Sequence, residues 1–508
     1  MTIFGVIIFV IILTVGGIAV DVMRYEYKRV SLQNTADRAV LAAGSMSQPN
    51  AAENVVRDYF RSEGLEDYLV AVNVDRGLNF RNVSVQSADT FPTMFMRLVG
   101  IDELSINLVS ASEERYNNVE VSLVLDISGS MNDNGRIQDL RRAGVEFIDT
   151  LFGNAEPGRV SVSIIPYAGQ VNPGSALARQ MSISPRLTQS QCVDFTENQF
   201  RTTELSPLTP LTGTGHFDPS LDGMAAQMFT CPVHAGVYSQ ISAFSSDPVE
   251  LRRQITNLTG YGGTSIDVGV KWGAALLDPS MRPAISGMIA AGDVTDSFEG
   301  RPLDYDDPSA LKILVVMTDG VNDREARMIP THKTGESPVY VDTIDNNVSI
   351  YLPSRPGNRK YYVPFIRSWQ DHPWGAIDAQ NLDSARRLTW DQVWARHSVY
   401  WVALNLYGIP LRNQWYSEYD IANNQYNNWW IKFTERAEKD QRLATICEAV
   451  RARDIPIFTI AFDAPPNGVA AMRDCATSDS HFFDVEGADL VGTFRAIAGT
   501  ISRLRLTQ

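Results

Sequence analysis

The segment Asp126-Ile-Ser-Gly-Ser130 constrains the fold and chemistry of this 508-residue chain more than any other stretch. It directly follows the largely apolar run Val119–Leu125, which has the character of a buried strand. A carboxylate and two hydroxyls at alternate positions after a strand end can direct three oxygens into one small volume. Such oxygens suit a hard divalent cation, whose remaining positions take water or a partner's carboxylate. The segment therefore predicts a metal site at the end of a strand; the alternative is an ordinary turn with a helix N-cap.

Two downstream positions complete this pattern. Thr264 lies in a glycine-rich loop, Tyr261–Asp267, ahead of a helical pattern, and Asp319 directly follows the apolar strand Ile313–Met317. The order D-x-S-x-S, distant Thr, distant Asp resembles the metal-ion-dependent adhesion site of von Willebrand factor type A domains. Because all three elements occur in order, at or beside predicted strand ends, the match is far more specific than a lone D-x-S-x-S.

This resemblance implies a set of metal ligands and a cofactor. The hydroxyls of Ser128, Ser130 and Thr264 would bind the cation directly, whereas Asp126 and Asp319 would act mainly through water and balance the charge. Mg²⁺ is the expected ion, with Mn²⁺ and Ca²⁺ as alternatives. The position left open on the cation would accept an Asp or Glu carboxylate from a partner.

The segment 117–508 alternates strand and helix patterns, which predicts an α/β fold: a doubly wound, mostly parallel sheet like that of von Willebrand factor A domains. It is longer than this fold requires, and two insertions, near 176–255 and 324–437, account for the excess. Eight of the nine tryptophans lie between Trp369 and Trp430, in the second insertion. They supply either a core for that insertion or an exposed surface for a glycan or protein ligand.

The N-terminal residues predict a membrane anchor. Thr2–Val20 contains no charged side chain and, as a helix, is long enough to cross the hydrocarbon core of a bilayer. A cleaved signal peptide or a buried core helix would share this composition. The lack of a basic residue ahead of the span, and a helix pattern that continues through Asp21, favour a retained transmembrane helix over residues 1–20. Basic residues between Arg24 and Arg29 would by themselves place the C-terminal side of the span in the cytoplasm.

The next residues, 21–47, predict a juxtamembrane helix. The patterns V-D-x-x-R from Val20 and L-Q-x-x-A-D-x-A-x-L-A-A from Leu32 resemble the start of TadG-type proteins of bacterial Tad (Flp) pilus assembly. The segment Phe91–Gly100 is similar to a T-F-F-M-R-L-x-G segment of the same proteins. An apolar stripe on the helix indicates packing either on its own domain or in a pilus-like assembly. Residues 48–115 predict a small α+β domain.

Four cysteines allow three disulfide pairings. Cys447 precedes a late strand and Cys475 follows it, so both can reach one end of the sheet, and the resemblance implies a cysteine at each place. We expect the bridges Cys447–Cys475 and Cys192–Cys231, which are typical of an oxidising compartment. With the resemblance to pilus-assembly proteins, they favour a single-pass protein of the bacterial inner membrane whose large C-terminal domain is periplasmic. A place at the cell surface or on a pilus is the alternative.

Charge and missing motifs narrow the function. The net charge of −15, from 44 basic and 59 acidic residues, argues against nucleic acid as a partner. The sequence has no P-loop, nucleophile motif or metalloprotease histidine spacing, so we expect no enzymatic activity. The predicted function is a membrane-anchored component of Tad/Flp pilus assembly that binds a pilus-assembly or pilin protein through the metal site. The alternative is a surface or pilus-tip adhesin for host or surface ligands.

Overall fold

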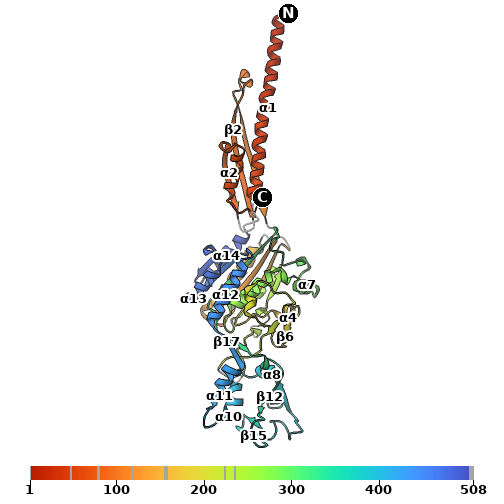
Figure 1. Cartoon of the computed structure of the whole chain (residues 1–508), viewed down its shortest axis with the longest axis vertical. Helices are drawn as coiled ribbons and strands as arrows, with labels where there is room; N and C mark the ends of the chain where they lie inside the picture. Colours follow the sequence, from red (N-terminus) through yellow and green to blue (C-terminus); the bar gives the residue numbers. More distant parts are fainter. Residues whose placement is uncertain are drawn as a thin grey trace. The chain divides into compact units, whose positions relative to one another are not determined.

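Two compact units make up the chain, Met1–Asn117 with Gly499–Gln508, and Asn118–Ala498 (Figure 1). The computed structural model describes the whole chain except residues 1, 46–47, 77–79, 116–117, 154–157, 222, 224, 234–235 and 503–508. The domain boundaries predicted at 47 and 117 fall on residues outside this description. Each unit has its own buried apolar cluster.

The N-terminal unit combines a long helix with a small antiparallel sheet. Helix α1 spans Thr2–Gly44, and among the described residues it is the one helix long and apolar enough to cross a membrane. Most side chains from Ile3 to Val15 are exposed, whereas Leu32 and Ala36 are buried. The apolar stripe therefore packs on its own domain from Leu32 to Ala43, whereas Val22 at its start is exposed. The remaining elements are α2 (Ala52–Ser62) and the sheet β1-β2-β3 (Leu69–Arg76, Phe80–Pro92, Glu103–Arg115).

The second unit is built on a six-stranded sheet, which confirms the α/β architecture expected from the sequence. Four of the five strand pairings are parallel; the edge strand β9 runs antiparallel to its neighbour. The strand order is β19 (Phe482–Val485), β18 (Ile457–Phe462), β10 (Ala310–Thr318), β4 (Asn118–Asp126), β5 (Val160–Tyr167) and β9 (Ser242–Ser245).

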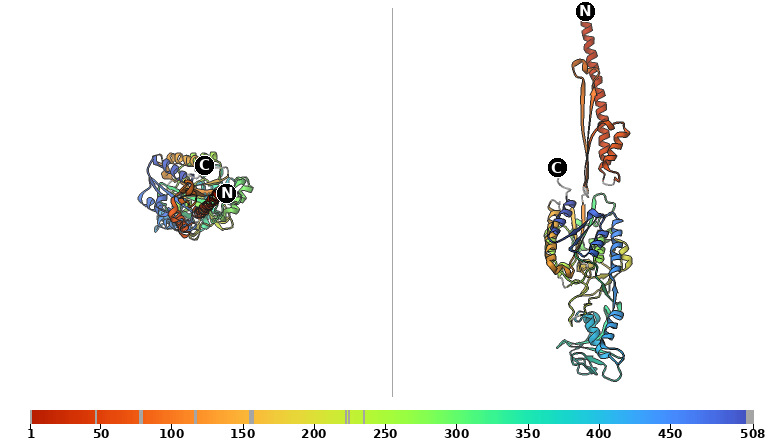
Figure 2. Two further views of the ribbon diagram at one scale, coloured as in Figure 1. Left: turned by 90° about the horizontal axis from the view of Figure 1, so that it is seen from above. Right: turned by 90° about the vertical axis from the view of Figure 1, so that its left-hand side faces the viewer.

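Helices lie on either side of this sheet (Figure 2). Helix α6 packs against β4, β5 and β10, and α12 packs against α6. Helix α3 packs against α5, and its Phe147 meets Phe494 of α14 edge to face. The helices are α3 (Arg136–Phe152), α5 (Pro248–Thr256), α6 (Ile266–Leu277), α12 (Arg436–Arg451), α13 (Pro466–Cys475) and α14 (Asp489–Ser502).

The range predicted for the first insertion, 176–255, includes elements of the main sheet at its end. Its last part forms β9 and α5, which belong to the sheet and its helices. Periodicity missed this because β9 has only four residues. The earlier part contains a small sheet in the order β6 (Ile183–Ser184), β8 (Leu211–Gly213) and β7 (Val193–Asp194).

The tryptophan-rich segment has its own core. Strands β11 (Glu325–Met328) and β17 (Ile431–Thr434) pair at its two ends. Between them the chain forms a five-stranded antiparallel sheet with short helices, and Trp390, Trp394 and Trp430 are buried among its apolar residues. The sheet order is β15 (Ser368–Gln370), β14 (Tyr361–Val363), β13 (Val348–Tyr351), β12 (Glu336–Asp342) and β16 (Ala385–Thr389).

Both expected disulfides are present. Cys447 of α12 is bonded to Cys475 of α13, with Cα atoms 5.2 Å apart. Cys192 is bonded to Cys231, with Cα atoms 5.8 Å apart, and joins two loops of the first insertion. Disulfides persist in oxidising compartments, so the two bridges agree with a location outside the cytosol.

Candidate metal centre

Strands β4 and β10 bring two distant carboxylates to the same edge of the sheet. The strands are parallel neighbours, and Leu125 lies opposite Met317 in the register. Asp126 is the last residue of β4, and Asp319 directly follows β10. Because parallel strands end at a common edge, the two residues emerge side by side where open α/β sheets bind ligands.

The oxygens of this edge form one connected cluster. Asp319 Oδ1 accepts a hydrogen bond from Ser130 Oγ at 2.8 Å and lies 3.5 Å from Ser128 Oγ. The two serine hydroxyls are 3.0 Å apart. Asp126 Oδ1 accepts from the backbone N–H of Ser128 at 2.7 Å, which fixes the loop that carries both hydroxyls. Four of the five predicted ligands are thus brought together.

The fifth, Thr264, is placed beside the same cluster by its glycine-rich loop. The N–H of Gly129 donates to the carbonyl oxygen of Gly262 at 2.8 Å, so this loop and the serine loop are joined directly. An added Cβ on Gly320 would lie 3.8 Å from Thr264 Oγ1, which puts that hydroxyl next to the residue after Asp319.

Further hydrogen bonds, to Asp323 and Lys439, fix the loop that carries Thr264. The backbone N–H of Thr264 donates to Asp323 Oδ2 at 3.1 Å. Lys439 Nζ, which is fully buried, donates to the carbonyl oxygen of Thr264 at 3.2 Å and to Ser265 Oγ at 2.5 Å. The loop is therefore fixed on both sides of the threonine.

Three residues that the sequence did not reveal complete the surroundings of the carboxylates. Thr318 Oγ1 donates to Asp126 Oδ2 at 2.7 Å. Tyr167 Oη lies 3.2 Å from the same Oδ2 and 3.0 Å from the carbonyl oxygen of Met317, and can donate to either. Arg136 Nη1 donates to Asp319 Oδ2 at 3.1 Å. Thr318 directly follows the predicted strand Ile313–Met317, which was a sequence signal for it alone; no such signal marked Tyr167 or Arg136.

A glycine on a neighbouring helix also shapes the site. A Cβ on Gly468 of α13 would clash with the carbonyl oxygen of Gly320. This close approach lets the helix support the backbone directly after Asp319. No sequence signal separates Gly468 from other glycines near the start of a helix.

The charge of the cluster fits a divalent cation. Asp126 is fully buried and Asp319 nearly so. Burial, and second the nearby Asp319 carboxylate, raise the pKa of Asp126 to about 7. Burial also raises the pKa of Asp319, although Ser130 and Arg136 oppose this. A cation beside the two carboxylates would remove the cost of ionising both in a buried place.

The donor types point to the same class of ion. Among the described residues, no group of three or more His, Cys, Asp or Glu side chains is placed to hold a metal. Any metal at this edge must therefore take hydroxyl oxygens as well as carboxylates. Such an all-oxygen set suits Mg²⁺, Mn²⁺ or Ca²⁺ and not the softer ions that favour sulfur or imidazole.

Mg²⁺ affinity is expected to rise with pH up to about 7, the raised pKa of Asp126. Below this pKa the proton on Asp126 competes with the cation, so affinity should increase about tenfold per pH unit if one proton is released. Above it the carboxylate is already ionised and the affinity should level off. Calorimetric titrations between about pH 5.5 and about pH 8.5 measure this directly. An affinity that does not change over this range would contradict the involvement of Asp126.

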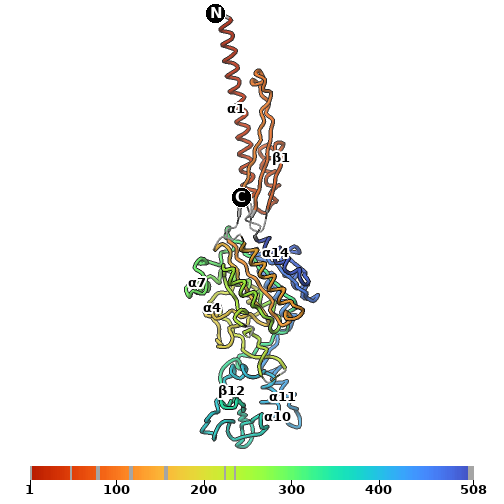
Figure 3. The backbone as a smooth tube through the Cα atoms, turned by 180° about the vertical axis from the view of Figure 1, so that it is seen from behind, coloured from red at the N-terminus to blue at the C-terminus, as the bar shows by residue number. Residues whose placement is uncertain are grey.

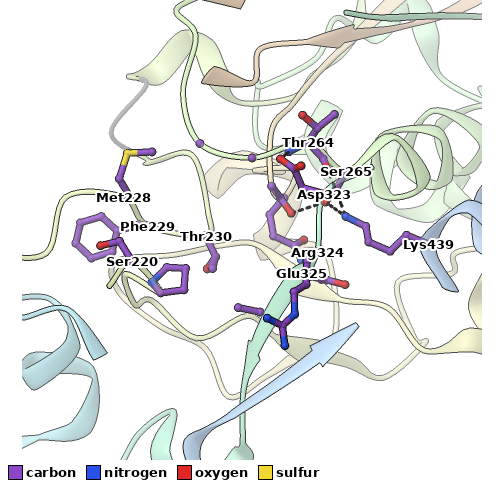
Figure 4. Close-up of a pocket in the computed structure, with 16 residues that line it drawn as sticks. Ser220, Met228, Phe229, Thr230, Thr264, Ser265, Asp323, Arg324, Glu325 and Lys439 are labelled. Carbon is purple, nitrogen blue, oxygen red and sulfur yellow. Dashed lines mark hydrogen bonds between the residues drawn. The ribbon is translucent and has the colours of Figure 1, made fainter. Parts of the chain in front are cut away.

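A cavity of about 410 Å³ opens beside Thr264 (Figure 4). Its polar wall includes Ser265, Asp323 and Lys439, and the opposite side carries Met228 and Phe229. The apolar side comes from the first insertion, whereas the polar wall belongs to loops and helices around the sheet. A ligand that reached the cation would therefore have space for its neighbouring side chains next to Thr264.

The fold and the oxygen cluster define an α/β protein with a candidate divalent-metal edge and an apolar N-terminal helix. Residues 1–47 match the Tad family model, described as "Putative Flp pilus-assembly TadE/G-like". Over residues 1–47 this match agrees with the resemblance seen in the sequence. A search of curated proteins found no match to the chain.

Several solved structures are similar to parts of the chain. The von Willebrand factor domain of the type V pili tip protein Mfa5 from Porphyromonas gingivalis is 15% identical; the match covers 77% of this chain and 98% of that one, with a TM-score of 0.31. The pilus adhesin SpaC from Lactobacillus rhamnosus GG is 10% identical, over 85% and 34% of the two chains, with a TM-score of 0.32. A von Willebrand factor type A protein from Catenulispora acidiphila is 10% identical, over 84% and 48%, with a TM-score of 0.26. Likenesses this distant do not transfer a function to this chain.

Proposed function

We propose that this protein is a membrane-anchored, non-enzymatic component of Tad/Flp pilus assembly that binds a partner through a divalent cation. Helix α1 would hold it in the bacterial inner membrane with the second unit in the periplasm. Ser128, Ser130 and Thr264 would contact the cation, which is Mg²⁺ or alternatively Mn²⁺ or Ca²⁺. An Asp or Glu of a pilus-assembly or pilin protein would fill the open position.

The observation that carries this proposal is the oxygen cluster at the ends of β4 and β10. Two buried carboxylates lie next to two hydroxyls there. Among the described residues, only Arg136 forms an ion pair with either carboxylate, at 3.1 Å from Asp319 Oδ2. A dication held mainly by neutral hydroxyls keeps much of its charge, so it attracts an incoming carboxylate strongly. The match of residues 1–47 to a pilus-assembly family supplies the biological setting.

The cavity beside Thr264 supports docking of a protein segment rather than a free ion alone. Its apolar Met228 and Phe229 could cover side chains next to the acidic residue, while Asp323 and Lys439 offer polar partners. Apolar contact combined with a few convergent polar groups is typical of specific binding sites. The two disulfides favour the periplasm as the compartment.

Partner capture from cells that carry Tad/Flp pilus genes tests the proposal. The tagged full-length protein, purified in mild detergent, should retain pilus-assembly or pilin proteins in Mg²⁺ or Mn²⁺ and lose them in EDTA. Ser130→Ala should lose them in either condition, because Ser130 lies in the oxygen cluster. Ser175→Ala, at an exposed position of α4 (Gly174–Arg179), is the matched control and should retain them. Equal capture in EDTA and Mg²⁺ would show that the metal edge does not bind the partner.

Protease treatment of intact cells separates this function from that of a surface adhesin. A periplasmic second unit should be protected until the outer membrane is opened. Cleavage on intact cells would instead favour the adhesin, for which the exposed Trp415 and Trp429 of the tryptophan-rich segment offer a ligand surface.

A further inference from the structure

We propose that the loop between β2 and β3, Thr93–Asp102, inserts its apolar side chains into the surface of the membrane that α1 crosses. This inference rests on the proposed anchoring by α1 and adds a second membrane contact, made by the folded part of the N-terminal unit. Lipid, and not another protein, would cover the exposed apolar side chains of this loop. The tip of the β2–β3 hairpin lies alongside α1 in the side views (Figure 1, the right view of Figure 2, and Figure 3).

A single buried carboxylate ties this loop to the end of the apolar span. Asp21, the first charged residue of α1, is fully buried. Its Oδ2 accepts hydrogen bonds from the backbone N–H groups of Met94, Phe95 and Met96 at 3.0, 2.6 and 2.8 Å. These are N–H groups at the start of the short helix η2 (Met96–Val99), which would otherwise lack partners. The loop is therefore held at the level where the apolar segment ends.

Phe95 reaches further toward the N-terminus of α1. A Cβ on Gly17 would lie 2.5 Å from Phe95 Cδ1, so the ring rests on a place that only glycine leaves open. Gly17 precedes Asp21 by four residues, which is about 6 Å along a helix axis. The ring thus lies beside residues that would be within the hydrocarbon core if Thr2–Val20 spans it.

The loop exposes an unusual amount of apolar surface. Met94, Phe95, Leu98, Val99 and Ile101 have exposed fractions between 38% and 74%. The loop is also well ordered internally, because Thr93 Oγ1 donates to the carbonyl oxygen of Ile101 at 2.5 Å and its N–H donates to that of Asp102 at 3.0 Å. Five large apolar side chains gathered in one fixed loop indicate an interaction surface.

Two features on the same unit favour lipid over a protein as the occupant. The exposed loop is continuous with the exposed apolar surface of α1, to which Asp21 and Phe95 join it directly. Basic side chains lie at the level where headgroups would be: Arg97 is exposed beside Asp102, and Arg24 lies over the ring of Phe91. Apolar residues with basic neighbours are typical of segments that enter the boundary between headgroups and acyl chains by about 5–10 Å.

Site-directed fluorescence in vesicles tests this proposal. The four native cysteines are bonded in pairs, so a single new cysteine can be labelled with an environment-sensitive dye. The full-length protein carrying Leu98→Cys would be reconstituted in vesicles of phosphatidylcholine and phosphatidylglycerol. We expect the emission of this label to shift to the blue and to be quenched by lipids that carry a nitroxide on the acyl chain.

Two further labels give the comparison its meaning. Val109→Cys is the matched control: Val109 is exposed and apolar, but lies on β3 about 20 Å beyond its first residue. Its label should remain in water and escape quenching. Phe9→Cys, in the apolar half of α1, should be quenched if α1 spans the bilayer. A Phe9 label left in water would overturn the anchoring part of the proposed function.

If the label at Phe9 is quenched but the label at Leu98 is as exposed to water as the label at Val109, the loop proposal is wrong and the anchoring by α1 still holds. A Leu98 label that is shielded from water yet not quenched by lipid would overturn it too, because a protein would then cover the loop. Leu98→Lys gives an independent check by placing a charge in the proposed contact. It should reduce the quenching of a label at Met94, whereas Val109→Lys should not.

Discussion

Replacing Asp126 with alanine is expected to lower the affinity for Mg²⁺ and Mn²⁺ by at least about 100-fold, or about 3 kcal/mol. The carboxylate supplies half of the negative charge that the two aspartates offer to a cation. It also holds the serine loop, through its bond to the N–H of Ser128, and meets Thr318 on the other side. Loss of the charge and loss of the fixed serine loop should both lower the affinity for the cation. Isothermal titration calorimetry on the full-length protein in detergent measures the affinity.

The same substitution should leave the protein folded, even though Asp126 is fully buried. Its removal costs hydrogen bonds but also relieves the repulsion from Asp319 that helps to raise the pKa of Asp126. Asp126→Asn keeps the size of the side chain and should lose metal binding in the same way. Asp479→Ala, at an exposed position, is the control and should bind normally. Unchanged affinity in either Asp126 variant would remove this residue from the metal site.

Most of the oxygen cluster at the ends of β4 and β10 was predicted from the sequence, because its residues lie in a short motif and at strand ends. The resemblance to von Willebrand factor A domains implied that Asp126 and Asp319 belong to one site, and the apolar runs before them placed both at strand ends. The structure brings them together because β4 and β10 are parallel neighbours that end at one edge. The hydroxyls of Ser128 and Ser130 then followed from the alternating spacing. That prediction needed the motif and the positions of strand ends, and not the packing of any side chain.

Other residues of the site could not be predicted, because their importance depends on packing. Tyr167 and Thr318 are the last residues of β5 and β10, two strands with apolar sequences. The sequence pattern of a strand does not predict which loop a polar side chain at its end will contact. Lys439 is 175 positions from Thr264 in sequence, and its helix has no local feature that marks it as a support for that loop. The bond from the N–H of Phe95 to Asp21 is of the same kind. Such contacts join elements that lie far apart in the sequence, and hydrophobic periodicity does not predict how these elements pack together.

The insertions show a second limit of prediction. Tryptophan enrichment was compatible with either a separate core or an exposed surface, and the structure buries Trp390 and Trp394 in a core. It did not tell which tryptophans remain outside, and Trp415 and Trp429 are exposed. The range predicted for the first insertion also includes β9 of the six-stranded sheet, which a pattern search does not find because so short a strand carries too few residues for a period to appear.

Lys439→Met is expected to lower the free energy of unfolding of the second unit by about 3–5 kcal/mol, because it leaves a buried charge without its partner. The ammonium group lies 3.7 Å from Asp267 Oδ1, and both side chains are fully buried. Arg442 Nη1 lies 3.8 Å from Asp267 Oδ2 and forms a closer ion pair with Glu325 Oε2 at 3.2 Å. Arg442 therefore cannot fully replace the lysine as the partner of Asp267. Chemical denaturation followed by circular dichroism measures the change.

This lysine also links stability to the metal edge. Its bonds to the carbonyl oxygen of Thr264 and to Ser265 Oγ fix the loop that carries the third hydroxyl, so Lys439→Met should weaken Mg²⁺ binding as well. Lys432→Met, at an exposed position of β17, is the matched control and should change neither property. Equal stability of the Lys439 and Lys432 variants would show that the buried pair contributes nothing.

The double variant Lys439→Met with Asp267→Asn separates the two effects of Lys439. Removing both charges leaves no unpaired carboxylate, so most of the lost unfolding free energy should return, as the non-additivity of neighbouring substitutions requires. Mg²⁺ affinity should not return with it, because the bonds to Thr264 and Ser265 remain absent. Recovery of both properties would mean that Lys439 acts on the metal edge only through the buried charge of Asp267. Recovery of stability alone would identify the lysine as the residue that positions Thr264 for the cation.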